Sequence, residues 1–361
     1  SFWIIAVGAG SEIHIPLITE LIGPGDGDTA DMNVEKEGRL VAGPITRMDH
    51  VDFTLDETGV MPITAITELS SGELEILDFA PDLSNLTTLQ NQSLVARSGG
   101  TILLPGFSNL NMADVVLEAN GQGSLLILPD LEHINGGQTV LETTTLRALQ
   151  GGRVDLPKLT TLSGDFLLSS TADDSVLSLK ALEQLTNIEN AKARISSSNG
   201  GTIEFGSPTL IRGDIRTSLT GMITGDTLTT GDESIIQGPG AIQTDFVSQA
   251  IIRLNNGAET LIVEGNVELD TSSRLEITIG LGTDRTGNGL LQVTGSASLG
   301  GTLEIIQSGL YSPQVDDSFE IVTYGSKTGN FSATEGLDLK NNLVGQLEIT
   351  DQSITLNVVA P

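Results

Sequence analysis

A short proline-led motif recurs through the middle of the sequence at nearly constant spacing. In each full copy, apolar residues stand two and five positions after the proline. The copies are Pro81 with Leu83 and Leu86, Pro105 with Phe107 and Leu110, Pro129 with Leu131 and Ile134, and Pro157 with Leu159 and Leu162. Leu182 and Leu185 keep the apolar pair, a degraded copy begins at Pro208, and successive copies start 24, 24, 28, 23 and 28 residues apart. This period predicts a solenoid with one coil per repeat.

Paired glycines precede several of these prolines and open short apolar runs, as at Gly99-Gly100, Gly151-Gly152 and Gly200-Gly201. Glycine pairs supply the backbone angles of tight corners, and the alternating apolar residues after them are typical of strands. Helical periodicity does not persist in this region. We therefore expect an all-β chain, a right-handed parallel β-helix (solenoid) with coils of about 24 residues and three short strands per coil.

A second repeat lies in the C-terminal third. Residues 261–269 match residues 291–299 at an offset of 30, and each copy leads into an apolar strand. These patterns predict four regions: 1–71, a strand-rich cap or inter-subunit connector; 72–215, regular solenoid repeats; 216–260, irregular solenoid; and 261–361, a C-terminal β section and cap.

The Gly-Gly strand openers and proline-led leucine pairs resemble the repeats of receptor L-domains and parallel β-helices of exported surface proteins. The stretch from Leu291 to Phe331 is similar to the C-terminal β-helix segment of bacterial autotransporter-type passengers, although the turn at Asp316-Asp317 departs from the usual glycine. The resemblance implies an exported bacterial protein. It implies little about chemistry.

Charge and composition exclude several classes of partner. The chain has 17 Lys and Arg against 47 Asp and Glu, a net charge of −30, which opposes binding to nucleic acid or to anionic lipid. It contains no cysteine, so neither disulfides nor thiolate chemistry are available. No apolar run reaches the roughly 18 residues of a membrane span. The first residue is Ser1 rather than Met, which favours a processed, exported chain or a fragment, and we expect it at the cell surface or outside the cell.

The sequence holds little that points to an enzyme. Its three histidines are scattered, and no nucleophile elbow, phosphate loop or two-histidine metal motif is present. Asp155 and Glu204 occupy the same strand position of different repeats and are candidate acids for a polysaccharide lyase or hydrolase, but equivalent positions hold Leu103 and Ser178. Aromatic residues make up only 3% of the chain, which disfavours sugar stacking. We expect no enzyme; the polysaccharide-acting enzyme is the alternative.

Calcium is the one cofactor that the sequence favours. Asp26, Asp28, Asp31 and Asn33 place hard oxygen ligands at short spacing in a glycine-rich stretch, as calcium sites require. Their spacing does not match an EF-hand loop. The alternative is diffuse screening of the negative charge by cations.

The N-terminal segment allows two interpretations. Its apolar, strand-like residues either cap the first coil of their own chain or add to a neighbouring copy in a head-to-tail, non-closing contact. The residues concerned are Phe2, Trp3, Ile4, Ile5, Val7, Ile13 and Ile15. The function expected is structural: a homopolymeric subunit of a bacterial surface fibre, or an adhesin stalk. A receptor-binding adhesin with an exposed apolar patch is a third possibility.

Overall fold

The protein is all-β, and most of its strands pair in parallel. The computed structural model describes residues 2–25, 27–139, 142–186, 193–206, 209–211, 213–218, 221–231, 234–255, 260–281 and 287–361. Strands account for 58% of the chain, and the helices of these described ranges are two short 3₁₀ turns, Ile63–Ala65 and Lys340–Asn342. This confirms the all-β class predicted from the sequence. None of the described helices has the length and apolar character needed to cross a bilayer.

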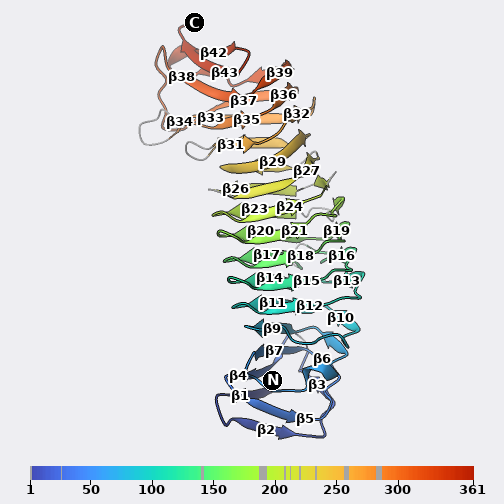
Figure 1. Cartoon of the computed structure of the whole chain (residues 1–361). Helices are drawn as coiled ribbons and strands as arrows, with labels where there is room; N and C mark the ends of the chain where they lie inside the picture. The colour runs from blue at the N-terminus through green and yellow to red at the C-terminus, as the bar shows by residue number, and fades with distance from the viewer. Residues whose placement is uncertain are drawn as a thin grey trace. The chain divides into compact units, whose positions relative to one another are not determined.

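The chain forms two compact units. Among described residues, the first unit contains positions up to Leu182, Thr186 and Gly201–Glu204, and the second contains Glu183–Leu185, 193–200 and 205 onward. Figure 1 shows the strands of the first unit in blue to green and those of the second in yellow-green to red. Each unit is described separately below.

The longest ladder of the first unit joins strands that are one repeat apart in the sequence. Its strands pair in parallel in chain order. They are β1 (Trp3–Val7), β4 (Ala30–Glu35), β7 (Val51–Asp56), β9 (Glu73–Leu77), β11 (Ser93–Arg97), β14 (Val116–Asn120), β17 (Thr144–Leu149) and β20 (Phe166–Thr171).

The strand register places large apolar residues next to one another on the inner side of this ladder. One inward column consists of Ile4, Met32, Phe53, Leu74, Leu94, Leu117, Leu146 and Leu168. Every member from Met32 onward is at most 1% exposed. Alternation along each strand therefore sends one set of side chains to the core and the other to the surface.

Shorter strands complete each repeat of the first unit. Two small sheets serve the N-terminal part: β2 (Glu12–Ile15) with β5 (Arg39–Ala42), and β3 (Glu20–Ile22), β6 (Arg47–Asp49), β8 (Glu68–Ser70) and β10 (Thr88–Gln90). The following repeats use β12 (Thr101–Leu103), β13 (Asn109–Asn111), β15 (Leu125–Ile127), β16 (His133–Asn135), β18 (Arg153–Asp155), β19 (Thr161–Ser163) and β21 (Val176–Leu179). All of these strands pair in parallel.

The apolar pairs of the sequence repeat lie in the core, whereas their prolines lie at the surface. Exposure is at most 8% for Leu83, Leu86, Phe107, Leu110, Leu131, Ile134, Leu159, Leu162, Leu182 and Leu185. From the second copy onward, the second member of each pair is the inward residue of a strand, and Leu110 pairs with Ile134, which pairs with Leu162. Pro81 and Pro129 are half-buried, and Pro105 and Pro157 are exposed. Parallel pairing begins earlier than the repeat, at β1, so the N-terminal segment belongs to the ladder.

The glycine pairs make the corners between these strands. Gly151 has φ +85°, a left-handed conformation that favours glycine. At Gly152 an added Cβ would lie 2.2 Å from the carbonyl oxygen of Ala119, one repeat earlier. The first glycine of the pair therefore turns the chain, and the second lets two successive repeats approach closely.

The second unit repeats the parallel arrangement. Its first ladder contains β23 (Ala193–Ser198), β26 (Gly213–Ser218), β28 (Ile235–Gln237), β30 (Ile251–Leu254), β33 (Arg274–Leu281), β37 (Thr302–Gln307) and β40 (Ala333–Glu335), with β34 (Gly287–Asn288) antiparallel to β33. Its other strands are β25 (Thr209–Ile211), β27 (Met222–Thr230), β29 (Gly240–Ser248), β31 (Thr260–Val263), β32 (Val267–Leu269), β35 (Leu290–Val293), β36 (Ser296–Leu299), β38 (Ser318–Thr323) and β39 (Ser326–Gly329). β22 (Gln184–Thr186) and β24 (Thr202–Phe205) contain residues of both units.

An antiparallel hairpin ends the second unit. β42 (Leu343–Ile349) pairs with β43 (Ser353–Val359), which also pairs antiparallel with β38, and β41 (Asp338–Leu339) pairs with β42. The hairpin therefore covers the edge of β38 that a further parallel strand would occupy.

Candidate functional site

The N-terminal strands present an unpaired edge. Within the described residues, β1, β2 and β3 each pair on one side only, with β4, β5 and β6. We call the unpaired side of these three strands the N-terminal edge. Strand edges carry free backbone N–H and C=O groups and template association with another chain.

Apolar side chains surround this edge. Trp3 is 70% exposed and Ile5 is 54% exposed on the outer side of β1. Ile4, at the end of the inward column, is only half-buried, as are Phe2, Val7, Ile13 and Ile15. Further large apolar side chains that are exposed nearby in the sequence are Leu17, Ile18 and Ile22. Of the residues that the sequence predicted for assembly, Phe2 directly precedes β1 and the others lie on β1 and β2.

The C-terminal part of the second unit presents shielded edges. In the pairing of β36 with β39, Lys327 stands opposite Ala297, an inward residue that is fully buried. The Lys327 ammonium donates hydrogen bonds to the Gly329 carbonyl, at 3.2 Å, and to Asn330 Oδ1, at 3.1 Å. A short strand and an inward charge are two devices that protect an edge from strand addition.

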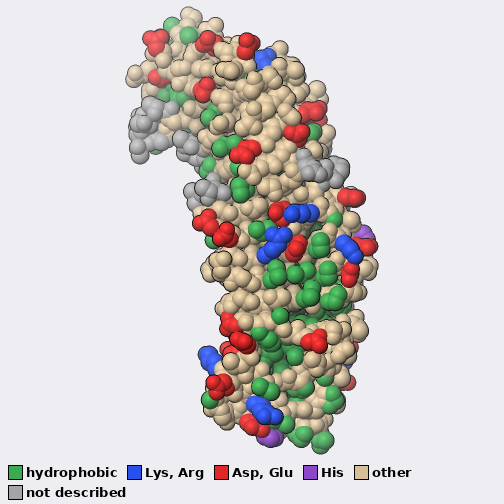
Figure 2. Space-filling view, viewed as in Figure 1, with side chains coloured by type: hydrophobic (Ala, Val, Ile, Leu, Met, Phe, Trp, Pro, Cys, Tyr) green, Lys and Arg blue, Asp and Glu red, His purple; other side chains and the backbone are tan. Residues whose placement is uncertain are grey.

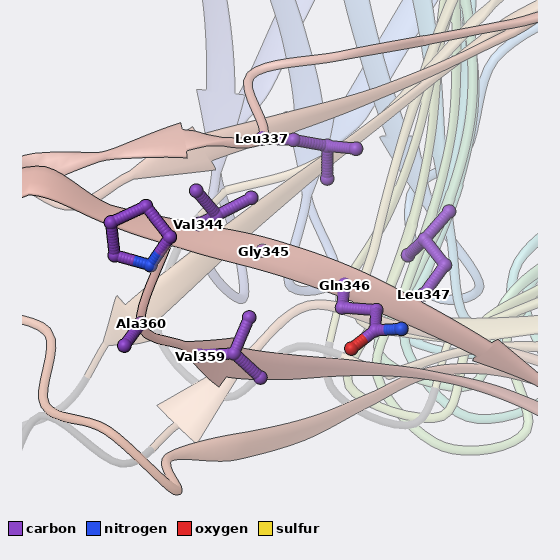
Figure 3. A pocket seen from close by; sticks show the side chains of 8 residues that line it. Leu337, Val344, Gly345, Gln346, Leu347, Val359 and Ala360 are labelled. Carbon is purple, nitrogen blue, oxygen red and sulfur yellow. The ribbon is translucent and has the colours of Figure 1, made fainter.

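A cavity lies beside the terminal hairpin of the second unit. Its volume is about 600 Å³, and Figure 3 shows the side chains that line it, among them Val344 on β42 and Val359 on β43. The lining residues are Leu337, Val344, Gly345, Gln346, Leu347, Val359, Ala360 and Pro361. No residue of this lining bears a charged side chain, so the cavity offers apolar contact and little chemistry.

The two candidate acids of the enzyme alternative lie in an ion-pair cluster of the first unit. Arg153 Nε lies 3.6 Å from Asp155 Oδ2, and Arg153 Nη2 lies 3.5 Å from Glu204 Oε2. Lys180 Nζ lies 3.3 Å from the same Glu204 oxygen. Figure 2 shows basic and acidic side chains side by side over the strands β18, β21 and β24.

The charged side chains of this cluster pair with one another across neighbouring strands. In register, Leu103 pairs with Ile127, Ile127 with Asp155 and Asp155 with Ser178, so one position changes from apolar to acidic to hydroxyl along the ladder. Both carboxylates face cations of the chain, and the Ser178 hydroxyl is buried without a hydrogen-bond partner. Nothing in this arrangement sets one carboxyl apart as a general acid.

Two of the predicted calcium ligands lie on one strand, and a third lies in the turn before it. Asp31 and Asn33 are outward residues of β4, and Asp28 forms an isolated bridge with Gly25; Asp26 lies outside the described residues. Asp31 pairs with Asp52, and Asp52 pairs with Glu73. Burial raises the pKa of Glu73, and the neighbouring Glu75 raises it further.

No described group of three or more His, Cys, Asp or Glu side chains has an arrangement that could hold a metal ion. Calcium binding therefore stays a prediction. The acidic neighbours Asp52 and Glu73 were missed in the sequence because their proximity to Asp31 depends on register between repeats. The spacing of 21 residues from Asp31 to Asp52 and from Asp52 to Glu73 is the signal that identifies them.

A fully buried glutamate lies on the outer side of the first unit's main ladder. Glu118 accepts hydrogen bonds from Arg97 Nε, at 3.2 Å, from Arg147 Nε, and from Asn120 Nδ2, at 3.0 Å. Arg97 also contacts Glu75 at 2.7 Å. These side chains join four successive strands, and Glu118 is 0% exposed beneath them.

Comparison with known proteins does not decide among these features. The chain matches no known protein family, and no curated protein is similar to it in sequence.

Proposed function

We propose that this chain is a structural protein of the bacterial surface or extracellular matrix, a subunit of a fibre or adhesin stalk that associates with copies of itself. The observation that carries the proposal is the N-terminal edge, where unpaired strands coincide with exposed Trp3 and Ile5. An exposed apolar side chain alone is ordinary, but a cluster of them beside a free strand edge favours association.

The fold proposed for each unit is a right-handed parallel β-helix. Its support is the parallel pairing of strands one repeat apart, in chain order, together with the strong preference of parallel crossover connections for the right hand. The resemblance to autotransporter-type passengers and to L-domain repeats belongs to the same proposal. So does the extracellular location, which the same resemblance implies.

The head-to-tail arrangement expected from the sequence requires the N-terminal edge of one copy to meet the C-terminal end of the next. A polysaccharide lyase or hydrolase is the alternative function. It has less support, because Asp155 and Glu204 both face Arg153 in the structure.

Sedimentation and negative-stain electron microscopy over a range of concentrations test self-association. We expect assembly that grows with concentration in the 361-residue chain and a loss of about tenfold or more in association constant for Trp3→Glu, as for central apolar anchors of other interfaces. The matched control is Leu310→Glu, because Leu310 is 76% exposed but lies far along the chain, in the second unit. A monomer at every concentration would contradict the proposal, and a polysaccharide depolymerisation screen would then be the next experiment.

A further inference from the structure

We infer that two copies of this chain pair through their N-terminal edges about a two-fold axis, with β1 of one copy antiparallel to β1 of the other. The inference rests on the proposed self-association and specifies its partner surface. It differs from the head-to-tail arrangement in one testable respect: equal residues of the two copies meet.

The C-terminal end is a poor acceptor for a strand. There the hairpin of β42 and β43 covers β38, β39 carries an inward lysine, and β40 is three residues long. Glu335 of β40 is already engaged with Arg274, at 2.6 Å. Head-to-tail stacking would set a charged, shielded edge against an apolar one.

The edge of β1 has none of these protections. β1 is five residues long, and its sequence Trp-Ile-Ile-Ala-Val contains no charged side chain. β2 and β3 of the same edge begin with Glu12 and Glu20. In a molecule of net charge −30, the uncharged β1 is therefore the part of the edge where two copies can pair without direct repulsion between like charges. Among the described strand ends, this edge is therefore the one best suited to meet its own copy.

The five-residue strand is also suited to pair with itself. If Ile5, the middle residue, lies on the two-fold axis, Trp3 faces Val7 of the second copy and Ile4 faces Ala6. Every facing pair is then apolar. Residues of equal parity face one another, so the inward residues Ile4 and Ala6 extend the buried columns of both copies. An isologous contact of this kind closes on itself, so it gives a two-fold dimer, which agrees with the stalk form of the proposed function and not with a head-to-tail fibre.

Because the chain contains no cysteine, a single cysteine introduced by substitution reports the contact directly through disulfide formation. In an antiparallel pair, facing Cα atoms lie about 4.5–5.5 Å apart, within reach of a disulfide. Under mild oxidation we expect Ile5→Cys to form a covalent dimer about tenfold faster or more than Leu310→Cys, whose exposed position measures random collision. Trp3 is the sole tryptophan, and its emission should shift to the blue on association.

A second pair of variants separates the two arrangements. Thr334→Cys alone should cross-link no faster than Leu310→Cys, and a mixture of Ile5→Cys with Thr334→Cys should form no excess of the mixed dimer. Rapid linkage between the two different variants, with no excess of linkage in the Ile5→Cys sample alone, would overturn the two-fold contact and retain self-association in a head-to-tail form. Absence of any association in sedimentation would overturn both. Ile5 and Thr334 are exposed, so neither substitution removes a core side chain.

Discussion

At the scale of single residues, the buried Glu118 shows how an outward position can become part of the structure. Strand alternation sends its side chain away from the core, yet two arginines from neighbouring strands cover it completely. A buried carboxylate is tolerated only where donors satisfy it. The second unit repeats the device at Glu276, which Arg253 and Arg274 contact at 2.5 and 3.7 Å.

Replacing Glu118 by alanine should therefore destabilise the first unit. The change leaves two arginines without their shared partner, but their side chains are 41% and 37% exposed, so water recovers part of the loss. We expect a decrease of about 1–3 kcal/mol in the free energy of unfolding, measured with urea. Glu57→Ala, at an exposed glutamate of the same unit, is the control. An unchanged unfolding midpoint would show that the cluster contributes nothing to stability.

The Asp56 carboxylate makes the stability of the turn that follows β7 depend on pH. Burial raises the pKa of its carboxyl, but hydrogen bonds from the backbone N–H groups of Lys36, Thr58 and Gly59 and from the Thr58 hydroxyl outweigh burial and lower it below 3.8. A lowered pKa in the folded state means that the carboxylate stabilises the fold at neutral pH and that this contribution disappears as pH falls through and below 3.8.

The difference in unfolding free energy between the wild type and Asp56→Ala measures this contribution against pH. It should be constant above about pH 5 and should shrink steadily at lower pH. Asp173→Ala, at an exposed aspartate of the same unit, is the control variant. A difference that does not vary between about pH 5 and about pH 2 would refute the assigned hydrogen bonds.

At the scale of elements, the second glycine of each pair allows successive repeats to approach closely, because it has no Cβ. A Cβ at Gly152 would lie 2.2 Å from the Ala119 carbonyl oxygen, and one at Gly100 would lie 2.2 Å from that of Ile76. Both neighbours are backbone atoms in paired strands and cannot move aside cheaply.

We expect Gly152→Ala to cost about 1–3 kcal/mol of unfolding free energy, as overpacking does elsewhere. Gly309→Ala is the matched control, since a Cβ there meets nothing within 4 Å and the backbone is not left-handed. Circular dichroism melting of both variants gives the comparison. Equal melting temperatures would show that adjacent repeats can separate at this corner without loss.

Much of the element-scale structure follows from sequence pattern. Leu110, Ile134 and Leu162 occupy equivalent motif positions, and the parallel register brings these residues together. The strand pairing of the N-terminal segment was harder to predict, because residues 1–71 lack the proline-led motif and their ladder depends on backbone register. The pattern of residues 261–361 predicts a β section and a cap but not the antiparallel hairpin, since periodicity does not distinguish an antiparallel partner from a parallel one.

At the scale of the whole molecule, the two ends of the chain differ in whether their strand edges are open or shielded. The sequence pointed to Trp3 and Ile5 as assembly residues because they are apolar and precede the repeat. It did not reveal that Lys327 occupies an inward position, because a lysine in a short polar run is usually solvated. Which edge is open and which is shielded depends on pairings between segments that are distant in the sequence.

The net charge of −30 also acts on the molecule as a whole. The response of the melting temperature to added salts distinguishes diffuse screening of this charge from a calcium site. Self-repulsion destabilises a compact acidic chain, so added salt should raise the melting temperature by a few degrees between about 0.01 and 0.3 M ionic strength, where the Debye length falls below about 10 Å.

Because screening depends on ionic strength and valence rather than on ion identity, we expect CaCl₂ and MgCl₂ at equal concentration to stabilise equally. Among the described residues, no group of three or more His, Cys, Asp or Glu side chains is arranged to hold a metal ion, which is the basis of this expectation. A larger rise with calcium than with magnesium, abolished in Asp31→Asn and kept in Asp173→Asn, would instead support the site predicted at Asp26, Asp28, Asp31 and Asn33. Differential scanning calorimetry in matched buffers, with a chelator as the starting state, decides between the two.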